Sequence, residues 1–351
     1  MTIITVNAER AYQVRLTKLW CEELAAICEG RTRVAVIISE TYAPDLAGLM
    51  ILDSELHVFQ VPDAEDGKSI GTLIKLWNWL GAAGFTRSDL VIGIGGGAIT
   101  DLAGFAAASW VRGLDWVAVP TSLAGMVDAS VGGKTGINSD YGKNLIGAFH
   151  SPIAVLIDTN FLSTLSDRDI AAGMAEVIKC GFIADTAILD LAGAHSVQTL
   201  RKNPDVISEL IRRAVTVKAQ VVSSDFKENF EREALNYGHT LGHAIEILSK
   251  YQLRHGEAVS IGLVYAAELA LARGLITQSD LDLHRSILSS YGLPITYDRH
   301  AWQKLAPLLA LDKKARGNTI RFVALNGIGT TIRLEDLSST ELDAAYERIS
   351  S

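Results

Sequence analysis

The sequence has few of the features that mark secreted, membrane-spanning or nucleic-acid-binding proteins. It contains three cysteines, Cys21, Cys28 and Cys180, an odd number with no zinc-binding spacing, so no disulfide framework is expected. No run approaches the ~20 uninterrupted apolar residues of a membrane-spanning helix, and the N-terminus lacks the basic and apolar segments of a signal peptide. With a net charge of −8 the chain has no surplus of Lys and Arg for nucleic-acid phosphates, although a local basic pocket could still bind a small anion. We therefore expect a cytoplasmic protein with neither a membrane nor a nucleic acid as partner.

Internal repeats and low-complexity tracts are also absent, and a length of 351 residues favours two domains of about 100–200 residues each. The first half alternates short β-branched runs with helical patterns. Buried strands are expected at Arg33 to Ile38, His57 to Val61, Leu90 to Ile94, Trp116 to Val119 and Ala154 to Ile157, and helices at Ser69 to Gly84 and Ile99 to Ser109. This alternation predicts an α/β domain with a mostly parallel sheet, whose ligands bind beyond the carboxyl ends of the strands.

The second half has long helical periods and few strands. Apolar residues at helical spacing predict helices at Asp167 to Phe182, Val206 to Ser224, Leu235 to Tyr251 and Ala258 to Ala272. Thr319 to Val323 and Thr330 to Arg333 could form a short late pair of strands. We place the boundary near residues 158–166, which gives an α/β domain at 1–162 and a mainly α-helical domain at 163–351.

A glycine-rich turn follows the predicted strand Leu90 to Ile94. Gly95, Gly96 and Gly97 lead directly into a predicted helix that contains Asp101. Glycines let the backbone approach a ligand, and the N-terminus of the helix presents free N–H groups to an anion. The turn therefore suits the pyrophosphate of a dinucleotide, and Glu40, just past an earlier strand, could hold ribose hydroxyls. The alternative interpretations are that the glycines only form a tight strand-to-helix turn and that Glu40 has no role in binding.

Histidines and a glutamate suggest a metal site in the second half. His239 and His243 stand four residues apart on one face of a predicted helix, and His255 begins the next helical pattern. Glu176 and Lys179 share a face of an earlier apolar helix. Three or four such groups could hold a divalent metal with one open position, as a catalytic site requires. Spacing alone favours His239 and His243 as the ligand pair, and the alternative is ordinary core or surface histidines.

Several lysines and arginines are adjacent in sequence to glycines or apolar residues. In such contexts a charged side chain less often serves only as a solvent-exposed surface charge. Lysine suits phosphate as a point charge, and arginine can hold a carboxylate through two hydrogen bonds. Each residue taken alone could be an ordinary surface charge, but together they suit a small phosphorylated acid. The set comprises Lys134, Lys143, Lys179, Lys218, Arg232, Lys313 and Lys314.

Taken in order, these segments resemble the dehydroquinate synthase family along nearly the whole chain. The matching segments are Gly95-Gly-Gly-Ala-Ile-Thr-Asp101, Arg112-Gly, Val119-Pro-Thr-Ser122, Asp128-Ala-Ser-Val-Gly-Gly-Lys134, Gly142-Lys143-Asn144, Glu176-Val-Ile-Lys179, Lys227-Glu228, Arg232, Asn236-Tyr-Gly-His239-Thr-Leu-Gly-His243, His255-Gly-Glu257 and Asp312-Lys313-Lys314. The resemblance implies an NAD-binding α/β domain, a helical domain that carries the metal, and a homodimer. It also implies an enzyme, a carbon–oxygen lyase that converts 3-deoxy-D-arabino-heptulosonate 7-phosphate to 3-dehydroquinate and phosphate in the shikimate pathway of aromatic amino acid biosynthesis, with NAD used catalytically.

The resemblance also implies a role for each matching residue. The metal, usually zinc with cobalt as an alternative, would be held by Glu176, His239 and His255, while His243 would face the substrate. Lys218 and Arg232 would hold the substrate carboxylate. The phosphate would be surrounded by Lys134, Asn144, Asn236, His243, one of Lys313 and Lys314, and Arg112 of the neighbouring subunit. The reacting sugar would be lined by Asp128, Lys134, Lys179 and Glu228. NAD would contact Glu40, Glu65, Lys68, Gly95, Gly96, Gly97, Asp101, Thr121, Ser122, Lys143 and Thr164.

The chain departs from the family pattern at two positions, and other functions stay open. The family often has Thr-Thr where this chain has Thr121-Ser122, and it more often has Asp at the position of Glu40. The alternatives are a cyclase for another sugar phosphate, a metal-dependent polyol dehydrogenase, and an inactive binding protein that keeps the fold. A cyclase whose substrate lacks a carboxylate would leave Lys218 and Arg232 without an anionic partner.

Overall fold

The computed structural model describes residues 1–42, 44–49, 53–227, 231–315 and 320–351, and for 310–315 the backbone alone. The chain forms two compact units. The first contains Met1–Leu165 and Lys218–Lys227, and the second contains Ser166–Val217 and Glu228–Ser351. Lys218–Lys227 thus belongs to the first unit, although it follows more than 50 residues of the second in the sequence.

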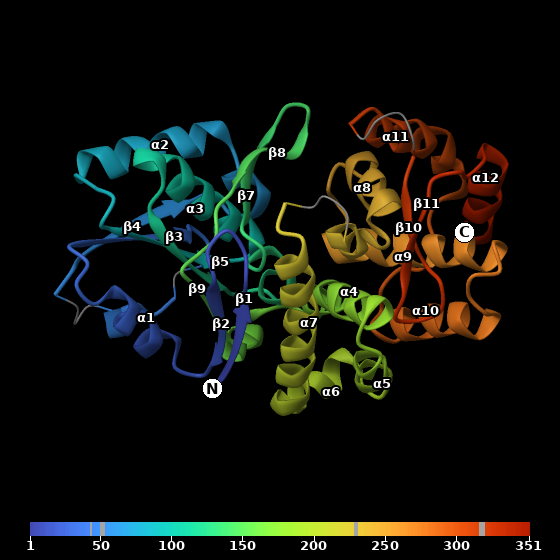
Figure 1. The fold of residues 1–351 in the computed structure, drawn as a ribbon, viewed down its shortest axis with the longest axis horizontal. Helices are drawn as coiled ribbons and strands as arrows, with labels where there is room; N and C mark the ends of the chain where they lie inside the picture. The colour runs from blue at the N-terminus through green and yellow to red at the C-terminus, as the bar shows by residue number, and fades with distance from the viewer. Residues whose placement is uncertain (43, 50–52, 228–230, 316–319) are drawn as a thin grey trace. The chain divides into compact units, whose positions relative to one another are not determined.

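The first unit contains a seven-stranded sheet with the order β1-β2-β9-β6-β5-β3-β4 (Figure 1). Every neighbouring pair is parallel except β1 and β2, which confirms the predicted mostly parallel sheet. Every residue of β5 is buried, as a strand covered on both faces should be. The strands are β1 (Thr2–Val6), β2 (Tyr12–Thr17), β3 (Arg33–Ser39), β4 (Glu55–Val61), β5 (Leu90–Gly95), β6 (Asp115–Pro120) and β9 (Ala154–Asp158).

Besides the helical residues Lys218–Ser224, the described part of the first unit contains three α-helices and a hairpin. They are α1 (Trp20–Cys28), α2 (Ile70–Ala82), α3 (Gly97–Ser109), and the antiparallel pair β7 (Lys134–Ser139) and β8 (Gly142–Phe149). Helix α3 lies so close to the sheet that a Cβ atom on Gly93 would be 2.7 Å from Cβ of Ala103. This packing fixes the N-terminus of α3 at the carboxyl end of β5.

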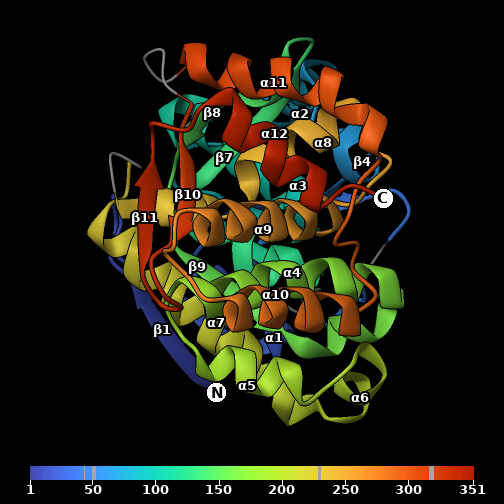
Figure 2. The same cartoon turned by 90° about the vertical axis from the view of Figure 1, so that its right-hand side faces the viewer.

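The second unit is mainly helical and is organised around α9 (His255–Ala272). All residues from Gly256 to Ala270 are buried, because α9 contacts α4, α8, α10 and α12 (Figure 2). The other helices are α4 (Asp167–Ile183), α5 (Ala187–Gly193), α6 (Val197–Lys202), α7 (Pro204–Ser224, which ends in the first unit), α8 (His239–Leu248), α10 (Gln278–Ser290), α11 (Trp302–Ala315) and α12 (Ser339–Arg348). The strands β10 (Phe322–Leu325) and β11 (Thr331–Leu334) form a hairpin.

Two expectations about the second unit need correction. The single helix predicted at Leu235 to Tyr251 is interrupted, since a 3-10 helix, η6 (Glu231–Asn236), ends before α8 begins at His239. Gly238 precedes α8 with φ +79°, a left-handed conformation that glycine adopts without steric cost and that breaks the helical path. The first late strand covers Phe322–Leu325 instead of Thr319 to Val323, and Thr319 lies outside the described residues.

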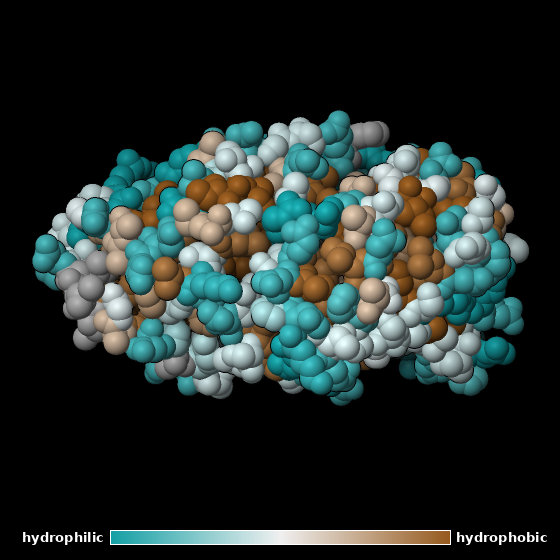
Figure 3. All heavy atoms as spheres, turned by 90° about the horizontal axis from the view of Figure 1, so that it is seen from below, coloured by the Kyte–Doolittle hydropathy of each residue, from teal (hydrophilic) through white to brown (hydrophobic). Residues whose placement is uncertain are grey.

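Among the described residues no helix has the length and apolar character needed to span a membrane. Figure 3 shows one face of the molecule, on which hydrophobic residues are interspersed with hydrophilic ones.

Candidate active site

Three side chains from three helices of the second unit converge on one point. Oε1 of Glu176, in α4, lies 3.5 Å from Nε2 of His239 and 3.3 Å from Nε2 of His255, which begin α8 and α9. All three ligand atoms lie within 4.8 Å of one another. Ligand atoms about 2.0–2.2 Å from a tetrahedral zinc ion are roughly 3.3–3.6 Å apart. The separations of 3.5 Å and 3.3 Å agree with that spacing.

The bonding of Glu176 provides a second test of this fit. Its side chain is buried, and Oε1 accepts no hydrogen bond from any described residue. The other oxygen, Oε2, accepts a hydrogen bond of 2.5 Å from Nζ of Lys179. A buried carboxylate oxygen without a hydrogen bond is costly, and a bound cation would remove that cost. The three residues therefore fit a divalent metal with one position left open.

Close backbone packing brings these helices together. A Cβ atom on Gly256 would lie 1.8 Å from the carbonyl oxygen of Ala172 in α4, and one on Gly262 would lie 1.8 Å from that of Gly238. Only glycine permits such approaches. The first contact sets His255 beside α4, and the second sets the start of α8 against α9. The positions of the three candidate ligands therefore depend on small residues next to them.

The pKa values of the three candidate ligands are shifted in different directions. Burial alone would raise the pKa of Glu176, but the charge of Lys179 and the nearby histidines hold it well below its usual value. Burial lowers the pKa of His239 to about 3, so this imidazole is neutral and able to act as a ligand. Burial also disfavours a charged His255, but the adjacent carboxylates of Glu176 and Glu246 raise its pKa to about 10.

Three further predicted residues belong to the second unit, and His243 lies beside the candidate ligands. His243 is exposed, with its ring centroid 5.2 Å from that of His239 and 6.2 Å from that of His255. His243, Glu246 and His255 form a second group of possible ligands. Arg232, in η6, is only 2% exposed, and Asn236 is half-buried at the end of the same 3-10 helix.

The predicted glycine-rich turn lies at the carboxyl edge of the sheet in the first unit. Gly96 is the half-buried N-cap of α3, and the nearest atom that a Cβ there would meet is Oγ of Ser122 at 3.5 Å, an ordinary contact. Thr121, which follows β6, donates its backbone N–H to the carbonyl of Gly95 at 2.8 Å. Glycine at Gly95 is also required by packing, because a Cβ atom would lie 2.6 Å from the side chain of Ile99.

A polar network lies beside this turn. Buried Lys68 donates to Asp101 at 2.5 Å and also to Oδ1 of Asn144, which adopts φ +57° in β8. Glu65 accepts a hydrogen bond of 2.7 Å from Asn138 and lies 3.8 Å from Nζ of Lys143. Burial raises the pKa of Asp101 to about 6, although Lys68 opposes this shift. The network joins five predicted site residues, at Glu65, Lys68, Asp101, Lys143 and Asn144.

Asp128 and Lys218 form an ion pair in the first unit. Nζ of Lys218 lies 2.5 Å from Oδ1 of Asp128 and also contacts the backbone carbonyl of that residue. Asp128 belongs to the short π-helix η4 (Gly125–Ala129), a type of turn frequent at functional sites. Lys134 follows Gly132 and Gly133, both with positive φ, and its side chain is exposed.

Other predicted residues lie apart from these networks or outside the described part. Glu40 is exposed just past β3, and Thr164 is exposed with its hydroxyl donating to the carbonyl of Phe161 at 2.7 Å. Ser122 accepts a hydrogen bond from the backbone of Gly125. Glu228 lies outside the described residues, and the side chains of Lys313 and Lys314, in α11, are not described.

The sequence patterns did not indicate Glu246, Tyr237 or Asn138. Glu246 is buried with Oε2 at 3.3 Å from Nδ1 of His255, and the carbonyl of Tyr237 lies 3.1 Å from Nδ1 of His239. A single acid within the apolar run Ala244 to Leu248 is a signal that could have identified Glu246.

Comparison with known proteins gives consistent results over nearly the whole chain. The models of the N-terminal and C-terminal parts of 3-dehydroquinate synthase match residues 58–172 and 173–315. The 3-dehydroquinate synthase of Paenarthrobacter aurescens strain TC1 is 53% identical over 307 residues, which are 88% of this chain and 83% of the relative. That of Mycolicibacterium vanbaalenii is 48% identical over 350 residues, 99% of this chain and 98% of the relative.

Solved structures of related folds also match. ValA, the 2-epi-5-epi-valiolone synthase of Streptomyces hygroscopicus subsp. jinggangensis 5008 with NAD+ and Zn2+ bound, has a TM-score of 0.90 and 28% identity over 99% of this chain and 98% of its own. A 2-deoxy-scyllo-inosose synthase has a TM-score of 0.84 and 24% identity over 99% of each chain, and this likeness shows the fold alone. The predicted fold class, an α/β domain followed by a helical domain, is confirmed.

Proposed function

Because this chain belongs to the 3-dehydroquinate synthase family, we propose that the groups of side chains described above carry out the reaction of that family. The chain is an enzyme, a carbon–oxygen lyase that converts 3-deoxy-D-arabino-heptulosonate 7-phosphate to 3-dehydroquinate and phosphate. The conversion proceeds by transient oxidation with NAD, elimination of phosphate, re-reduction and intramolecular aldol closure. When bound, NAD accepts and returns a hydride, and a divalent metal acidifies and orients substrate hydroxyls.

The metal is held by Glu176, His239 and His255 in this proposal. The observation that supports it most is the buried Oε1 of Glu176, which accepts no hydrogen bond from the described residues and lies 3.3–3.5 Å from two imidazole nitrogens. The low pKa of Glu176 supplies the negative charge, and Lys179 fixes its other oxygen. ValA, at 28% identity, contains Zn2+, so we propose zinc, with cobalt as a substitute.

NAD binds at the carboxyl edge of the sheet in the first unit. The half-buried glycine backbone at Gly96 and the N-terminus of the 13-residue helix α3 suit its pyrophosphate. The network around Lys68 and Asp101 would fix the adjoining loops. The full proposed set is Glu40, Glu65, Lys68, Gly95, Gly96, Gly97, Asp101, Thr121, Ser122, Lys143 and Thr164, of which Glu40 has the least structural support because it is exposed.

The substrate needs partners for a carboxylate, a phosphate and the sugar. Arg232 supports the carboxylate role, since a buried guanidinium suits a carboxylate that it can bind through two hydrogen bonds. Lys218 is proposed to share this role, and its pairing with Asp128 means that the substrate carboxylate would compete for or share its charge. The phosphate partners are Lys134, Asn144, Asn236, His243, one of Lys313 and Lys314, and Arg112. The residues proposed to line the sugar are Asp128, Lys134, Lys179 and Glu228.

We place the reaction in a cytoplasmic homodimer, in which Arg112 reaches the phosphate of the neighbouring subunit. Val111, Arg112 and Gly113 have φ values of +42°, +67° and +119°, and the side chain of Arg112 is exposed. Such strained conformations cost about 1–3 kcal/mol per non-glycine residue and are usually kept where function requires them. The three cysteines are unpaired, which agrees with a reducing compartment.

Another sugar-phosphate cyclase is the alternative function, since ValA and the inosose synthase share the fold. The higher identity to 3-dehydroquinate synthases, 53% and 48% against 28% and 24%, favours the carboxylate-bearing substrate.

Incubation of the purified protein with the heptulosonate phosphate, NAD and zinc tests the proposal. Phosphate release with a carbocyclic product and no net NADH is expected. Accumulation of NADH would indicate a dehydrogenase, and turnover of sedoheptulose 7-phosphate alone would indicate a different cyclase.

A further inference from the structure

We propose that Glu246 is a positioning residue of the metal centre, whose carboxylate holds the imidazole of His255 with Nε2 directed at Glu176. This inference rests on the proposed metal role of Glu176, His239 and His255. It adds a residue that lies outside that set and that contacts the metal only through His255.

The imidazole of His255 lies between two buried carboxylates. Its Nδ1 is 3.3 Å from Oε2 of Glu246, and its Nε2 is 3.3 Å from Oε1 of Glu176. Glu246 is 5% exposed and Glu176 is 1% exposed, so neither carboxylate is screened by bulk water. If the Nδ1–H donates to Glu246 and Nε2 has lost its proton, as metal binding requires, the lone pair of Nε2 points at the position where the metal would bind. Carboxylates that accept from the second nitrogen of a metal-bound histidine fix its tautomer and orientation in this way.

The sequence of α8 places Glu246 where this contact requires it. Glu246 is three residues after His243 and seven after His239, so all three lie on one face of the helix. That face is directed toward His255, as the ring separations of 5.2 Å to His239 and 6.2 Å to His243 show. Every other residue from Ala244 to Leu248 is apolar, and a buried acid in such a run needs a polar partner.

The other histidine is oriented by the backbone. Nδ1 of His239 lies 3.1 Å from the carbonyl oxygen of Tyr237, which leaves Nε2 for Glu176 at 3.5 Å. Both histidines thus use Nδ1 for an oxygen acceptor and Nε2 for the metal position. A backbone carbonyl cannot be removed by substitution, whereas the carboxylate of Glu246 can. Glu246 is therefore the side chain through which this orientation can be tested.

Direct ligation by Glu246 is the competing explanation, because His243, Glu246 and His255 also lie close enough to hold a metal. The buried Oε1 of Glu176 favours the positioning role. An ion bound between His243 and Glu246 would leave that oxygen without a partner among the described residues.

The experiment compares Glu246→Ala and Glu246→Gln with the wild-type protein by competition for zinc with a chromophoric chelator. We expect Glu246→Ala to bind zinc about 10–100-fold more weakly, the usual effect of removing such a partner. Glu246→Gln keeps an acceptor oxygen of nearly the same shape and should recover part of the loss. This variant also keeps the test decisive if the alanine variant fails to fold.

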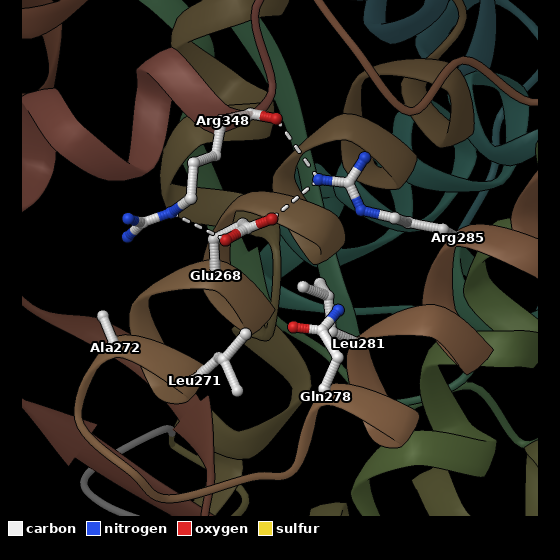
Figure 4. A pocket seen from close by; sticks show the side chains of 7 residues that line it. All are labelled: Glu268, Leu271, Ala272, Gln278, Leu281, Arg285 and Arg348. Carbon is white, nitrogen blue, oxygen red and sulfur yellow. Dashed lines mark hydrogen bonds and ion pairs between the residues drawn. The ribbon is translucent and has the colours of Figure 1, made fainter.

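Glu268→Gln provides a matched control. Glu268 is a carboxylate of α9 that is 3% exposed, but its partners are arginines, with Arg285 at 2.7 Å and Arg348 at 2.8 Å (Figure 4). This variant should lose stability and keep the wild-type zinc affinity. If zinc binding were weakened equally in Glu246→Gln and Glu268→Gln, the effect would come from removing any buried carboxylate. That result would overturn the proposal.

The visible spectrum of the cobalt-loaded proteins separates positioning from ligation. At saturating Co2+, a positioning role predicts the same coordination geometry in Glu246→Gln as in the wild type. A changed geometry would make Glu246 a ligand, and wild-type zinc affinity in Glu246→Ala would remove its role, so either result overturns the proposal. If the wild-type protein itself binds no zinc, the metal role of the proposed function fails instead.

Discussion

Replacing Gly256 with alanine should separate α9 from α4 and damage the metal centre without touching any proposed ligand. The new Cβ atom would lie 1.8 Å from the carbonyl oxygen of Ala172, where an ordinary contact begins at 3.4 Å. Because that oxygen belongs to the backbone of a helix, it cannot rotate away, and α9 must move by about 1.6 Å. His255 immediately precedes Gly256 and would move with it.

The Gly256→Ala substitution has two opposing effects on the free energy of unfolding. Overpacking in a well-packed core costs about 1–3 kcal/mol, and the contact with backbone places this position at the upper end. Alanine in place of a helical glycine gains up to about 1 kcal/mol. We expect a net loss of about 2 kcal/mol in the free energy of unfolding. Ligand distances at metal sites tolerate only about 0.2 Å, so zinc affinity should fall more than tenfold.

Denaturant unfolding of the zinc-free protein and chelator competition measure these two quantities. Gly193→Ala is the control, since a Cβ atom at this helical position would meet nothing closer than 3.9 Å. It should leave zinc affinity unchanged and stability unchanged or slightly higher. Wild-type stability and zinc affinity in Gly256→Ala would refute the claim that this close approach sets the ligand geometry.

Three further predictions concern other parts of the chain. Replacing Arg232 with alanine should weaken a carboxylate-bearing inhibitor by a few kcal/mol and its carboxylate-free analogue much less, and equal inhibition constants for wild type and variant would remove the role. Mixing inactive Arg112→Ala and Lys134→Ala proteins should restore activity in mixed dimers, and mixed dimers without activity would exclude a shared site. Burial lowers the pKa of His284 to about 4, below its ordinary 6.5, so its contribution to stability is complete above pH 6.5 and is lost as the pH falls toward 4. At about 1.36 kcal/mol per unit the loss approaches about 3 kcal/mol, and denaturant unfolding of His284→Gln should show a flatter pH dependence over this range than the wild type.

The sequence predicts the parts of the fold in which burial leaves a clear pattern. The five expected strands match β3, β4, β5, β6 and β9 to within two residues. Four of them are mostly buried apolar runs, but β4 is not the buried strand expected at His57 to Val61, since only Val61 in it is buried. The patterns did not indicate β1 and β2, where β1 is mostly exposed at the sheet edge, or the hairpin β7–β8, which is glycine-rich and largely exposed in β8. A strand that is mostly exposed leaves a weaker apolar pattern in the sequence than a buried one.

Residue spacing in the sequence predicts the candidate site less well than it predicts the fold. Helical spacing favours His239 and His243 as a ligand pair, but Glu176 and His255 meet His239 only through the packing of α4, α8 and α9. That packing depends on Gly256 and Gly262, and single-sequence patterns do not show which backbones these glycines approach. The resemblance to a family proposed the set of three, since it carries three-dimensional information that local spacing lacks.

The position of a bound zinc ion tests the central claim most directly. We predict that anomalous diffraction from zinc-loaded crystals shows one peak about 2.0–2.2 Å from Oε1 of Glu176 and from Nε2 of both His239 and His255. A peak between His243, Glu246 and His255, or no peak near Glu176, would contradict the account.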